Sequence, residues 1–441
     1  MTKRWWVVQV AACWLVCAGA FAADAVPHFK VGAASREITP SAAMPMWGYG
    51  DRHALLSQGV LDPMFAKAVV IDTGADKIAI VGMDMGRSPV PSSMVKIRKA
   101  VLDKAGVNYV MLVGSHTHHG PVLELKDEPE KGKGKFDDAV KYVPWLDEQL
   151  IDCIVDAAKD VQEARIGWGS KSVELNRNRH TKVEPKPRET ELAVVRIDDM
   201  KGNPIAILVN FAAHPTNIPG EILKFSPDYP GPMRSTVEEA LKTQCLFLQG
   251  AAGDMSCNKP AEADDYKLFG ALLGREVIEI AKGIETTAPE KPSIQCVDED
   301  FSFESRIDFQ NKMIQGLFKN AFFPELANAS LDEMPDNKVK AHLTTAMING
   351  ELALVGGSGE FFCNHSIRLK ERSRAKKTLF LGYCNGHNMY FPTVEAAAEG
   401  GYGGDATVSW VSIGAGELMM NKALENIYTF MGAYKMPGLT R

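Results

Sequence analysis

Long hydrophobic runs, closely spaced cysteines and blocks of basic residues are all scarce in this sequence of 441 residues. Beyond the apolar run near the N-terminus, no stretch is long and apolar enough to be a candidate membrane span. The formal net charge is −6 and no long basic block occurs, which argues against nucleic acid as a partner. The composition, 45% hydrophobic and 24% charged, is typical of a globular protein with one large core or two domains.

The eight cysteines are widely scattered. No Cys-x-x-Cys pair occurs, so the spacing indicates neither a cysteine metal site nor a dense disulfide scaffold. Cys13 and Cys17 lie in the N-terminal apolar run. In an oxidising compartment we expect at most one or two disulfides among the other six cysteines, which are Cys153, Cys245, Cys257, Cys296, Cys363 and Cys384.

The N-terminus has the pattern of a secretory signal peptide. Lys3-Arg4 is positively charged, the stretch from Trp5 to Gly19 is apolar, and Ala20-Phe21-Ala22 is a cleavage site of the small-x-small type. An uncleaved membrane anchor is the alternative, and the shortness of the apolar run argues against it. We therefore expect residues 1–22 to be removed and residues 23–441 to be exported, into the periplasm or the medium.

Apolar periodicity predicts an α/β fold. Residues 66–72 and 77–83 flank a turn and predict a β-hairpin. Helical spacing over 92–104, followed by an apolar run at 109–113, predicts a crossover to a parallel strand. With no internal repeat and no clear linker, we expect one large domain of mixed parallel and antiparallel sheets flanked by helices. Further strands are expected at 191–197, 204–211, 245–248, 342–348, 351–355 and 378–381, and further helices at 146–158, 232–241, 266–282 and 417–430.

The most informative stretch is Ser115-His116-Thr117-His118-His119-Gly120-Pro121, which follows the strand predicted at 109–113. Sites in α/β sheets form where strands end. If the backbone stays extended there, His116 and His118 point to the same side, and His119 points away in a structural role. Neutral imidazole is the commonest zinc ligand, so this spacing favours a metal site. A hydrogen-bonded polar loop without metal has the same pattern.

Other predicted strands also run into short loops that carry reactive side chains, namely His214, Asp254, Ser256, Glu360 and Tyr390. Loops distant in sequence can converge at one edge of a sheet in this way. Two histidines and a carboxylate form the shell of a catalytic zinc ion and leave one position for water. Each residue alone also has a structural explanation, such as capping a helix or a turn.

Taken in order, these motifs resemble the neutral, non-lysosomal ceramidase family of zinc-dependent amidases. The motifs are the stretch at 115–121, Phe-Ala-Ala-His-Pro-Thr at 211–216, Gly-Asp-Met-Ser-Cys-Asn at 253–258, Gly-Glu-Phe-Phe at 359–362 and Tyr-Phe-Pro-Thr at 390–393. The resemblance extends from Val31 to about Trp410. It implies that the chain is the family's catalytic domain, without the C-terminal immunoglobulin-like domain that family members usually carry.

The resemblance also implies roles for individual residues. The zinc ligands would be His116, His214, Glu360 and Tyr390. His118 would shuttle protons, Tyr402 would steady the substrate carbonyl and Ser256 would line the site. An arginine comes from Asn176-Arg177-Asn178-Arg179, in which we prefer Arg179.

The function implied is that of an exported zinc amidohydrolase that cleaves the N-acyl amide of ceramide-like lipids to a sphingoid base and a fatty acid. Such a lipid substrate implies contact with a membrane surface. Two departures from the family pattern bear on which substrate is cleaved. His119 stands where the family usually has serine, and residues 394–398 are poorer in tyrosine and glutamine than the same stretch of the family. The alternatives are a zinc hydrolase of another N-acyl amide, an ester or a lactone, and a catalytically inactive binding protein of the same fold.

Overall fold

An eight-stranded sheet forms the centre of the structure, a computed structural model that describes residues 28–434. Its strand order is β4-β3-β2-β1-β5-β7-β8-β9. The outermost pairs, β3 with β4 and β8 with β9, are parallel, and the neighbours between them are antiparallel. The strands are β1 (Lys30–Glu37), β2 (Phe65–Asp72), β3 (Lys77–Met83), β4 (Tyr109–Gly114), β5 (Gln162–Ser172), β7 (Glu191–Asp199), β8 (Pro204–Phe211) and β9 (Gln244–Gln249).

A four-stranded sheet packs against the inner face of the larger one. Its order is β11 (Ile294–Glu304), β12 (Lys338–Ile348), β13 (Leu352–Gly357) and β15 (Lys377–Leu381). Alternate residues of both sheets meet in one buried cluster, in which Ile80 and Leu208 of the large sheet join Leu354 of the small one. Burial of these strand faces is the main driving force that holds the two sheets together.

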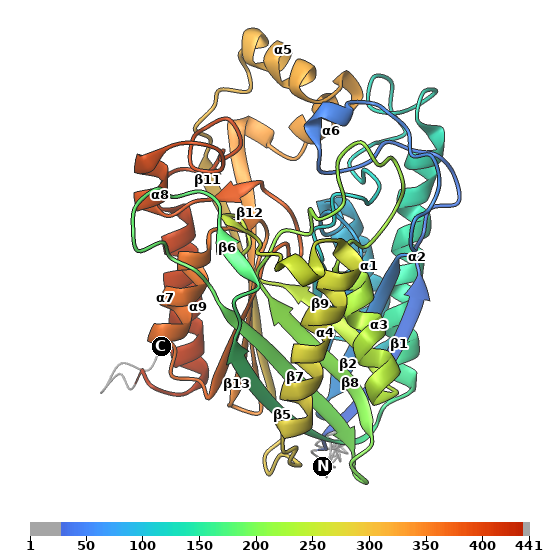
Figure 1. Cartoon of the computed structure of the whole chain (residues 1–441), viewed down its shortest axis with the longest axis vertical. Coiled ribbons are helices and arrows are strands. Elements are labelled where there is room, and N and C mark those ends of the chain that lie inside the picture. The colour runs from blue at the N-terminus through green and yellow to red at the C-terminus, as the bar shows by residue number, and fades with distance from the viewer. Residues whose placement is uncertain (1–27, 435–441) are drawn as a thin grey trace, which may run out of the picture.

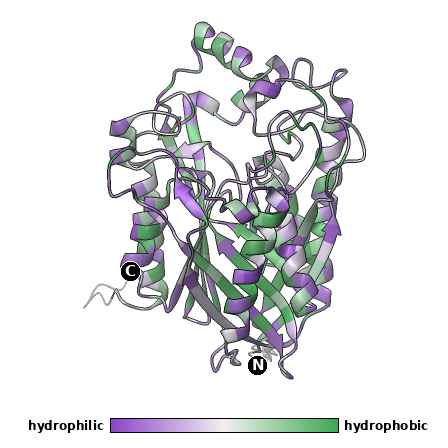
Figure 2. Cartoon of the chain, in the orientation of Figure 1, coloured by the Kyte–Doolittle hydropathy of each residue, from purple (hydrophilic) through white to green (hydrophobic). Residues whose placement is uncertain are grey.

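Helices cover the outer faces of both sheets (Figure 1). α1 (Pro91–Ala105) and α2 (Asp137–Lys159) pack on one half of the large sheet, and α3 (Pro230–Leu241) and α4 (Tyr266–Gly283) on the other. α7 (Cys363–Arg372) and α9 (Ala415–Phe430) cover the small sheet. Hydrophobic residues therefore concentrate on the strands and the inward helix faces (Figure 2).

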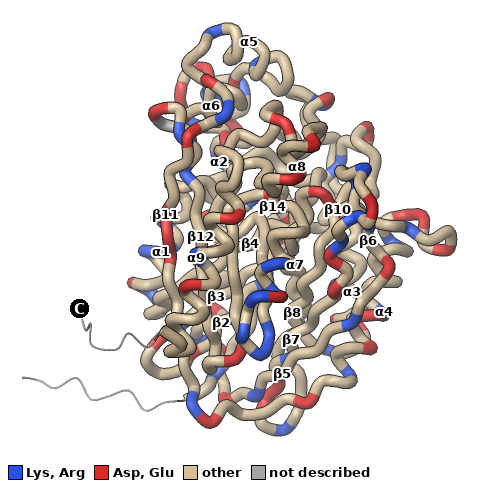
Figure 3. The backbone as a smooth tube through the Cα atoms, turned by 90° about the vertical axis from the view of Figure 1, so that its left-hand side faces the viewer, with Lys and Arg blue, Asp and Glu red and all other residues tan. Residues whose placement is uncertain are grey.

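The two ends of the molecule differ. β1 begins and α9 ends at the lower end in Figure 1. α5 (Lys312–Ala321) and α6 (Pro324–Leu331) lie at the opposite, upper end, and the side view in Figure 3 places them there as well. Residues 1–22, the predicted signal peptide, lie outside the described residues. Within residues 28–434, every helix is too short or too polar to cross a membrane.

The mixed α/β class is confirmed. The hairpin of β2 and β3 forms as expected, and α1 connects β3 to its parallel neighbour β4. The turn between β12 and β13 has Asn349 and Gly350 at φ values of 55° and 67°, the backbone that a two-residue Asn-Gly hairpin requires.

Several elements differ from the sequence-based expectation. α2 begins at Asp137 rather than at residue 146, because Pro144 is accommodated inside the helix. β11 and α5 were not predicted: β11 alternates polar with half-buried residues, and α5 has no buried residue. All six cysteines within residues 28–434 are unpaired, so the disulfides considered above do not form.

Candidate metal centre

Four loops at the upper ends of the strands carry the side chains of the predicted site. β4 leads into residues 115–119, and β8 leads into His214. β13 is followed by the short strand β14 (Glu360–Phe361), and β15 by a loop and β16 (Tyr390–Phe391). β14 and β16 pair in parallel with Glu360 opposite Tyr390. Strand ends of both sheets therefore meet at one place.

His116 reaches this place through a turn. The strand ends at Gly114, so the extended backbone considered for the histidines is wrong, and His116 has a φ of 68°. A residue with a Cβ is uncommon in this left-handed region, and such residues cluster at functional sites. His116 Nε2 and His118 Nε2 nevertheless lie 3.3 Å apart, so the two rings meet at one point without sharing the face of a strand.

Three polar atoms meet at the base of the site. His116 Nε2 lies 3.1 Å from His214 Nε2 and 3.3 Å from Glu360 Oε2. His214 Nε2 lies 3.2 Å from the same carboxylate oxygen. Each of these residues is at most 2% exposed. Ligand atoms around a tetrahedral zinc ion lie about 3.3 Å apart, so the three atoms have the spacing that one ion requires.

Hydrogen bonds to backbone carbonyls show which nitrogens carry protons. His116 Nδ1 lies 2.8 Å from the Gly86 oxygen, and His214 Nδ1 lies 2.6 Å from the Ala252 oxygen. Because a carbonyl only accepts, each Nδ1 carries the hydrogen and each Nε2 presents a lone pair. Glu360 Oε2 is buried without a hydrogen-bond partner. Buried lone pairs that face one another are unfavourable unless a cation binds them, so these residues fit a metal ion.

Burial keeps His118 and His214 neutral, and the neighbouring groups keep Glu360 ionised. Burial, reinforced by the Arg179 guanidinium, lowers the pKa of His214 to about 3. Burial also lowers the pKa of His118 well below its ordinary value, with help from His116 and His214. For Glu360 burial acts to raise the pKa, but the neighbouring histidines outweigh it and hold that pKa well below its usual range. Neutral imidazole and ionised carboxylate are the states that metal binding needs.

Arg179 connects the histidines with Tyr390. It follows β6 (Asn176–Asn178), which pairs with β10 (Met255–Cys257). Its Nη2 donates to the Gly253 oxygen at 3.0 Å and to Tyr390 Oη at 3.1 Å, and lies 2.9 Å from His214 Nε2. Arg177 lies two residues earlier, within β6, and is exposed on the surface. The structure thus places Arg179 at the site and brings the Tyr390 phenol within reach of the same guanidinium as His214.

His118 forms one wall of the site. Its ring packs edge-on against Trp47 and Tyr49, with centroid distances of 5.6 Å and 4.8 Å. Its Nδ1 is buried without a hydrogen-bond partner. A neutral imidazole beside the predicted metal ligands is suited to accept a proton. His119 points away and hydrogen-bonds to backbone carbonyls elsewhere, the structural role expected of it.

Tyr402 and Ser256 are placed differently. Tyr402 is 65% exposed at the cavity, with its ring 5.5 Å from that of Tyr390. The backbone of Ser256 pairs with that of His214 in an isolated β-bridge. Among the described residues, Ser256 is not one of those that line the cavity, so its expected place in the lining is wrong. The nearby Asp254 has a structural role. Its carboxylate accepts hydrogen bonds from Asn178 Nδ2 of β6 at 2.6 Å and from the Cys363 backbone N–H at the start of α7 at 2.7 Å.

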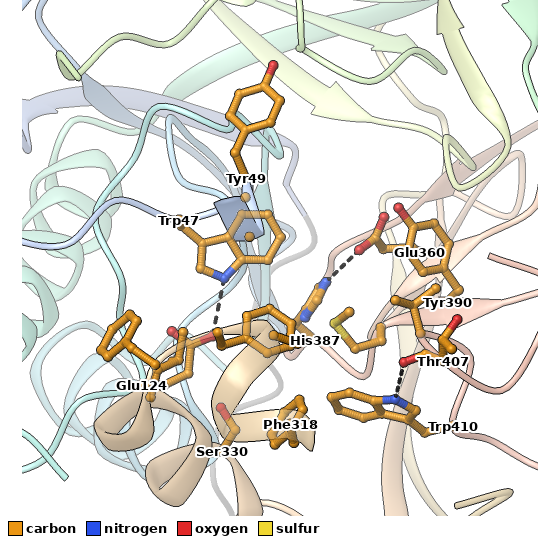
Figure 4. A pocket seen from close by; sticks show the side chains of 18 of the residues that line it. Trp47, Tyr49, Glu124, Phe318, Ser330, Glu360, His387, Tyr390, Thr407 and Trp410 are labelled. Atoms are coloured by element: carbon orange, nitrogen blue, oxygen red, sulfur yellow. Dashed lines mark hydrogen bonds and ion pairs between the residues drawn. The ribbon is translucent and has the colours of Figure 1, made fainter. Parts of the chain in front are cut away.

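His387 was not predicted, and the structure places it beside Glu360. Its Nε2 lies 3.2 Å from Glu360 Oε1, as the dashed line in Figure 4 shows. Trp47 packs edge-on against this ring at 5.3 Å and donates its indole N–H to Glu124 Oε1 at 3.2 Å. His387 could have been found from the sequence, because it lies in the loop that follows the strand predicted at 378–381. The other candidate residues were selected because they too lie in loops that follow predicted strands.

A cavity of about 950 Å³ lies above this cluster. In Figure 4, Glu360, His387 and Tyr390 lie apart from Phe318 and Trp410, which belong to the apolar part. A large apolar chamber with a few polar groups at one end suits a lipid-like ligand. The apolar walls come from α5, α6 and facing loops and include Trp47, Ile314, Phe318, Phe323, Leu326 and Trp410.

Comparisons with known proteins identify solved structures that share the fold of this chain. No family model and no curated protein sequence matches the chain. The crystal structure of neutral ceramidase from Pseudomonas aeruginosa matches with a TM-score of 0.73 and 17% identity, over 94% of this chain and 76% of that one. A ceramidase complexed with C2 matches with a TM-score of 0.71 and 15% identity, over 94% and 77%. The resemblance first noted in the motifs is thus confirmed in three dimensions, and this chain has the fold of the neutral ceramidases.

Proposed function

We propose that the protein is a zinc-dependent amidohydrolase that cleaves the N-acyl amide of ceramide-like lipids. The observation that carries the proposal is the buried, unpartnered Glu360 Oε2, which faces two imidazole lone pairs beneath a large apolar cavity. A cation explains the three converging acceptors, and a lipid chain explains the apolar walls. The likeness of the fold to that of solved ceramidases supports the same assignment.

The residues that would hold zinc are His116, His214, Glu360 and Tyr390. A bound zinc ion lowers the pKa of a coordinated water molecule towards neutrality and polarises a substrate carbonyl. Within residues 28–434, the first three residues meet at distances suited to one ion, and Tyr390 lies opposite Glu360 in the paired short strands. The ligand set therefore draws on both sheets.

His118 is the proton carrier in this proposal. It is neutral at physiological pH, because burial lowers its pKa, so it can accept a proton from the attacking water. The water oxygen forms the new bond to the carbonyl carbon, and the C–N bond breaks. His118 then returns the proton to the departing amine, which leaves a fatty acid and a sphingoid base.

Arg179 and Tyr402 stabilise the charge that develops on the carbonyl oxygen. Both line the cavity, and both can donate hydrogen bonds, from a guanidinium and from a phenol. Donors fixed in advance around a developing oxyanion give the largest single contribution to catalysis in such sites. The apolar walls exclude water from the acyl chain and strengthen these interactions.

Metal analysis combined with a substrate panel tests the proposal. We expect about one zinc ion per chain, and faster release of fatty acid from ceramide than from N-acyl amino acids, simple esters or lactones. Faster cleavage of one of those other compounds would assign the site to another zinc hydrolase. A protein that binds no zinc and gains no activity when zinc is added would be a binding protein. Export belongs to the same proposal, and the exported protein is expected to begin at Ala23.

We further propose that α5 contacts the lipid surface from which the substrate enters. Ile314, Leu317 and Phe318 on this helix line the cavity, and Met313 and Leu317 are also 68% and 59% exposed to solvent. The only charged residues of α5 are Lys312 and Lys319, which suit anionic headgroups. An exposed apolar face flanked by lysines is typical of a helix that lies in a membrane interface. α5 also lies at the upper end of the molecule, beside the cavity (Figure 3).

Met313→Glu is expected to weaken binding to phosphatidylcholine vesicles that contain phosphatidylglycerol by about tenfold or more, because burial of a methionine is worth about 1.5–3 kcal/mol and the new charge is repelled. Vesicle sedimentation measures the effect. The matched control is Met200→Glu, which alters a methionine 54% exposed in the turn between β7 and β8. Equal binding by wild type and Met313→Glu would remove α5 from the proposal.

A further inference from the structure

His387 is the nearest polar neighbour of the Glu360 carboxylate outside the predicted ligand set. The two oxygens of Glu360 have different surroundings. Oε2 faces the imidazoles of His116 and His214 at 3.3 Å and 3.2 Å, and Oε1 faces His387 Nε2 at 3.2 Å. An ionised carboxylate only accepts hydrogen bonds, so His387 donates from Nε2. One oxygen is thus engaged by a protein donor and the other is left for a cation.

The orientation of the His387 ring is fixed from behind. Trp47 lies edge-on against it at 5.3 Å and is itself held by the hydrogen bond from its indole N–H to Glu124 (Figure 4). The Trp47 ring packs tightly against the backbone at Gly86, where an added Cβ would lie 2.3 Å from the indole. His387 is 8% exposed. The ring therefore has little freedom to turn away from Glu360.

The support continues to the upper end of the molecule. Glu124 accepts a hydrogen bond from Arg87 at 2.9 Å, and Arg87 also pairs with Glu333, just after α6, at 3.0 Å. Arg87 and Glu124 are each at most 5% exposed. A buried ion pair of this kind is rigid, because breaking it leaves an unpaired charge in the interior. A chain of contacts therefore supports the Glu360 carboxylate from behind, and it runs through His387, Trp47, Glu124 and Arg87.

We propose that His387 is a positioning residue that makes Glu360 bind the metal through Oε2 alone. This inference rests on the metal site of the proposed function. A carboxylate that binds through both oxygens occupies two positions, whereas a carboxylate held by one oxygen leaves a position for water, which a catalytic zinc site requires. Residues that hydrogen-bond to metal ligands orient them and tune affinity in this way.

Two substitutions of similar size test the inference. His387→Gln keeps an N–H donor near the same position, and His387→Leu keeps the bulk but removes the donor. We expect His387→Leu to bind one zinc ion per chain with affinity weakened by about 10–100-fold, and His387→Gln to restore most of that loss. Chelator competition measures the affinity, and thermal unfolding of both variants checks that they are folded.

Cobalt substitution provides a readout that does not depend on activity. Four-coordinate Co²⁺ absorbs visible light far more strongly than six-coordinate Co²⁺, so the spectrum reports how many positions are filled. Extra ligation by the released Glu360 oxygen should weaken the bands in His387→Leu and leave those of His387→Gln close to wild type. The matched control is His342→Ala, a histidine whose ring pairs with Asp298 and Asp300 on the small sheet.

Each outcome is decisive. If His387→Leu binds no metal, His387 is a ligand and the positioning role is wrong. If its affinity and cobalt spectrum match wild type, His387 has no influence on Glu360 and the inference fails. If wild type binds metal but does not cleave ceramide, and the two His387 variants behave as predicted, only the proposed activity is wrong and the positioning role stands. Wild-type protein that binds no metal overturns both.

Discussion

His116→Ala is expected to lose the bound zinc and the hydrolytic activity together. The mutation removes one of the two imidazoles that meet Glu360 Oε2, so that only one imidazole and the carboxylate remain of the three atoms that converge at the base of the site. Activity should fall by more than about 100-fold, the upper range for removing a residue that only supports a ligand. Metal analysis of the purified variant, and hydrolysis measured with and without added zinc, provide the check.

His119→Gln is the matched control for this experiment. His119 is fully buried in the same motif but hydrogen-bonds to backbone carbonyls away from the cluster. We expect this variant to keep its zinc, even if its melting temperature falls. Zinc should raise the melting temperature of wild type and of His119→Gln, because a ligand that binds only the folded state stabilises it, and should leave His116→Ala unchanged. Retention of a full equivalent of zinc by His116→Ala would contradict the ligand set.

Arg179→Ala is expected to lower kcat by about 10²–10³-fold, the usual cost of removing one donor to a developing oxyanion. KM should change much less, because the apolar walls proposed to bind the lipid chain are formed by other residues. Arg179 is braced by hydrogen bonds to the Gly253 carbonyl and the Tyr390 phenol, so its guanidinium is oriented before substrate binds. Steady-state kinetics with a ceramide substrate measure the effect.

Arg177→Ala provides the comparison, because Arg177 lies two residues away in β6 and is exposed. We expect its kcat to stay within a factor of about two of wild type, as for other surface substitutions. Zinc content should be normal in both variants, which separates loss of transition-state stabilisation from loss of the metal. Equal losses in the two variants, or a change in KM alone, would exclude the role given to Arg179.

Much of the candidate site was predictable from the sequence because each predicted ligand follows a strand in a recognisable motif. His116, His214, Glu360 and Tyr390 were named before the structure placed them together. The reason given for the two histidines was incomplete, since His116 turns into the site with a φ of 68° rather than along an extended strand. Sequence periodicity describes regular elements and does not describe a single turn.

The parts that were missed depend on contacts between distant residues. His387 acts on a carboxylate 27 positions earlier, and Trp47 holds it from the N-terminal region. No spacing within a strand or a helix reports such a pair. α5 was missed for a different reason: it has only ten residues, contains Gly316 and buries none of them, although its apolar residues lie on one side of the helix. A short helix with an internal glycine is only weakly indicated by its sequence.

The division of the ligands between the two sheets has a mechanical consequence. His116 and His214 follow strands of the large sheet, whereas Glu360 and Tyr390 follow strands of the small one. An ion bound by all four would be a further cross-link between two layers that are joined by apolar contact and by polar bonds such as that from Asn210 Nδ2 to the Phe380 oxygen. Chelation would then remove one link between the layers while their buried apolar faces stay in contact, so that loss of the ion would lower the stability of the protein as well as its proposed activity.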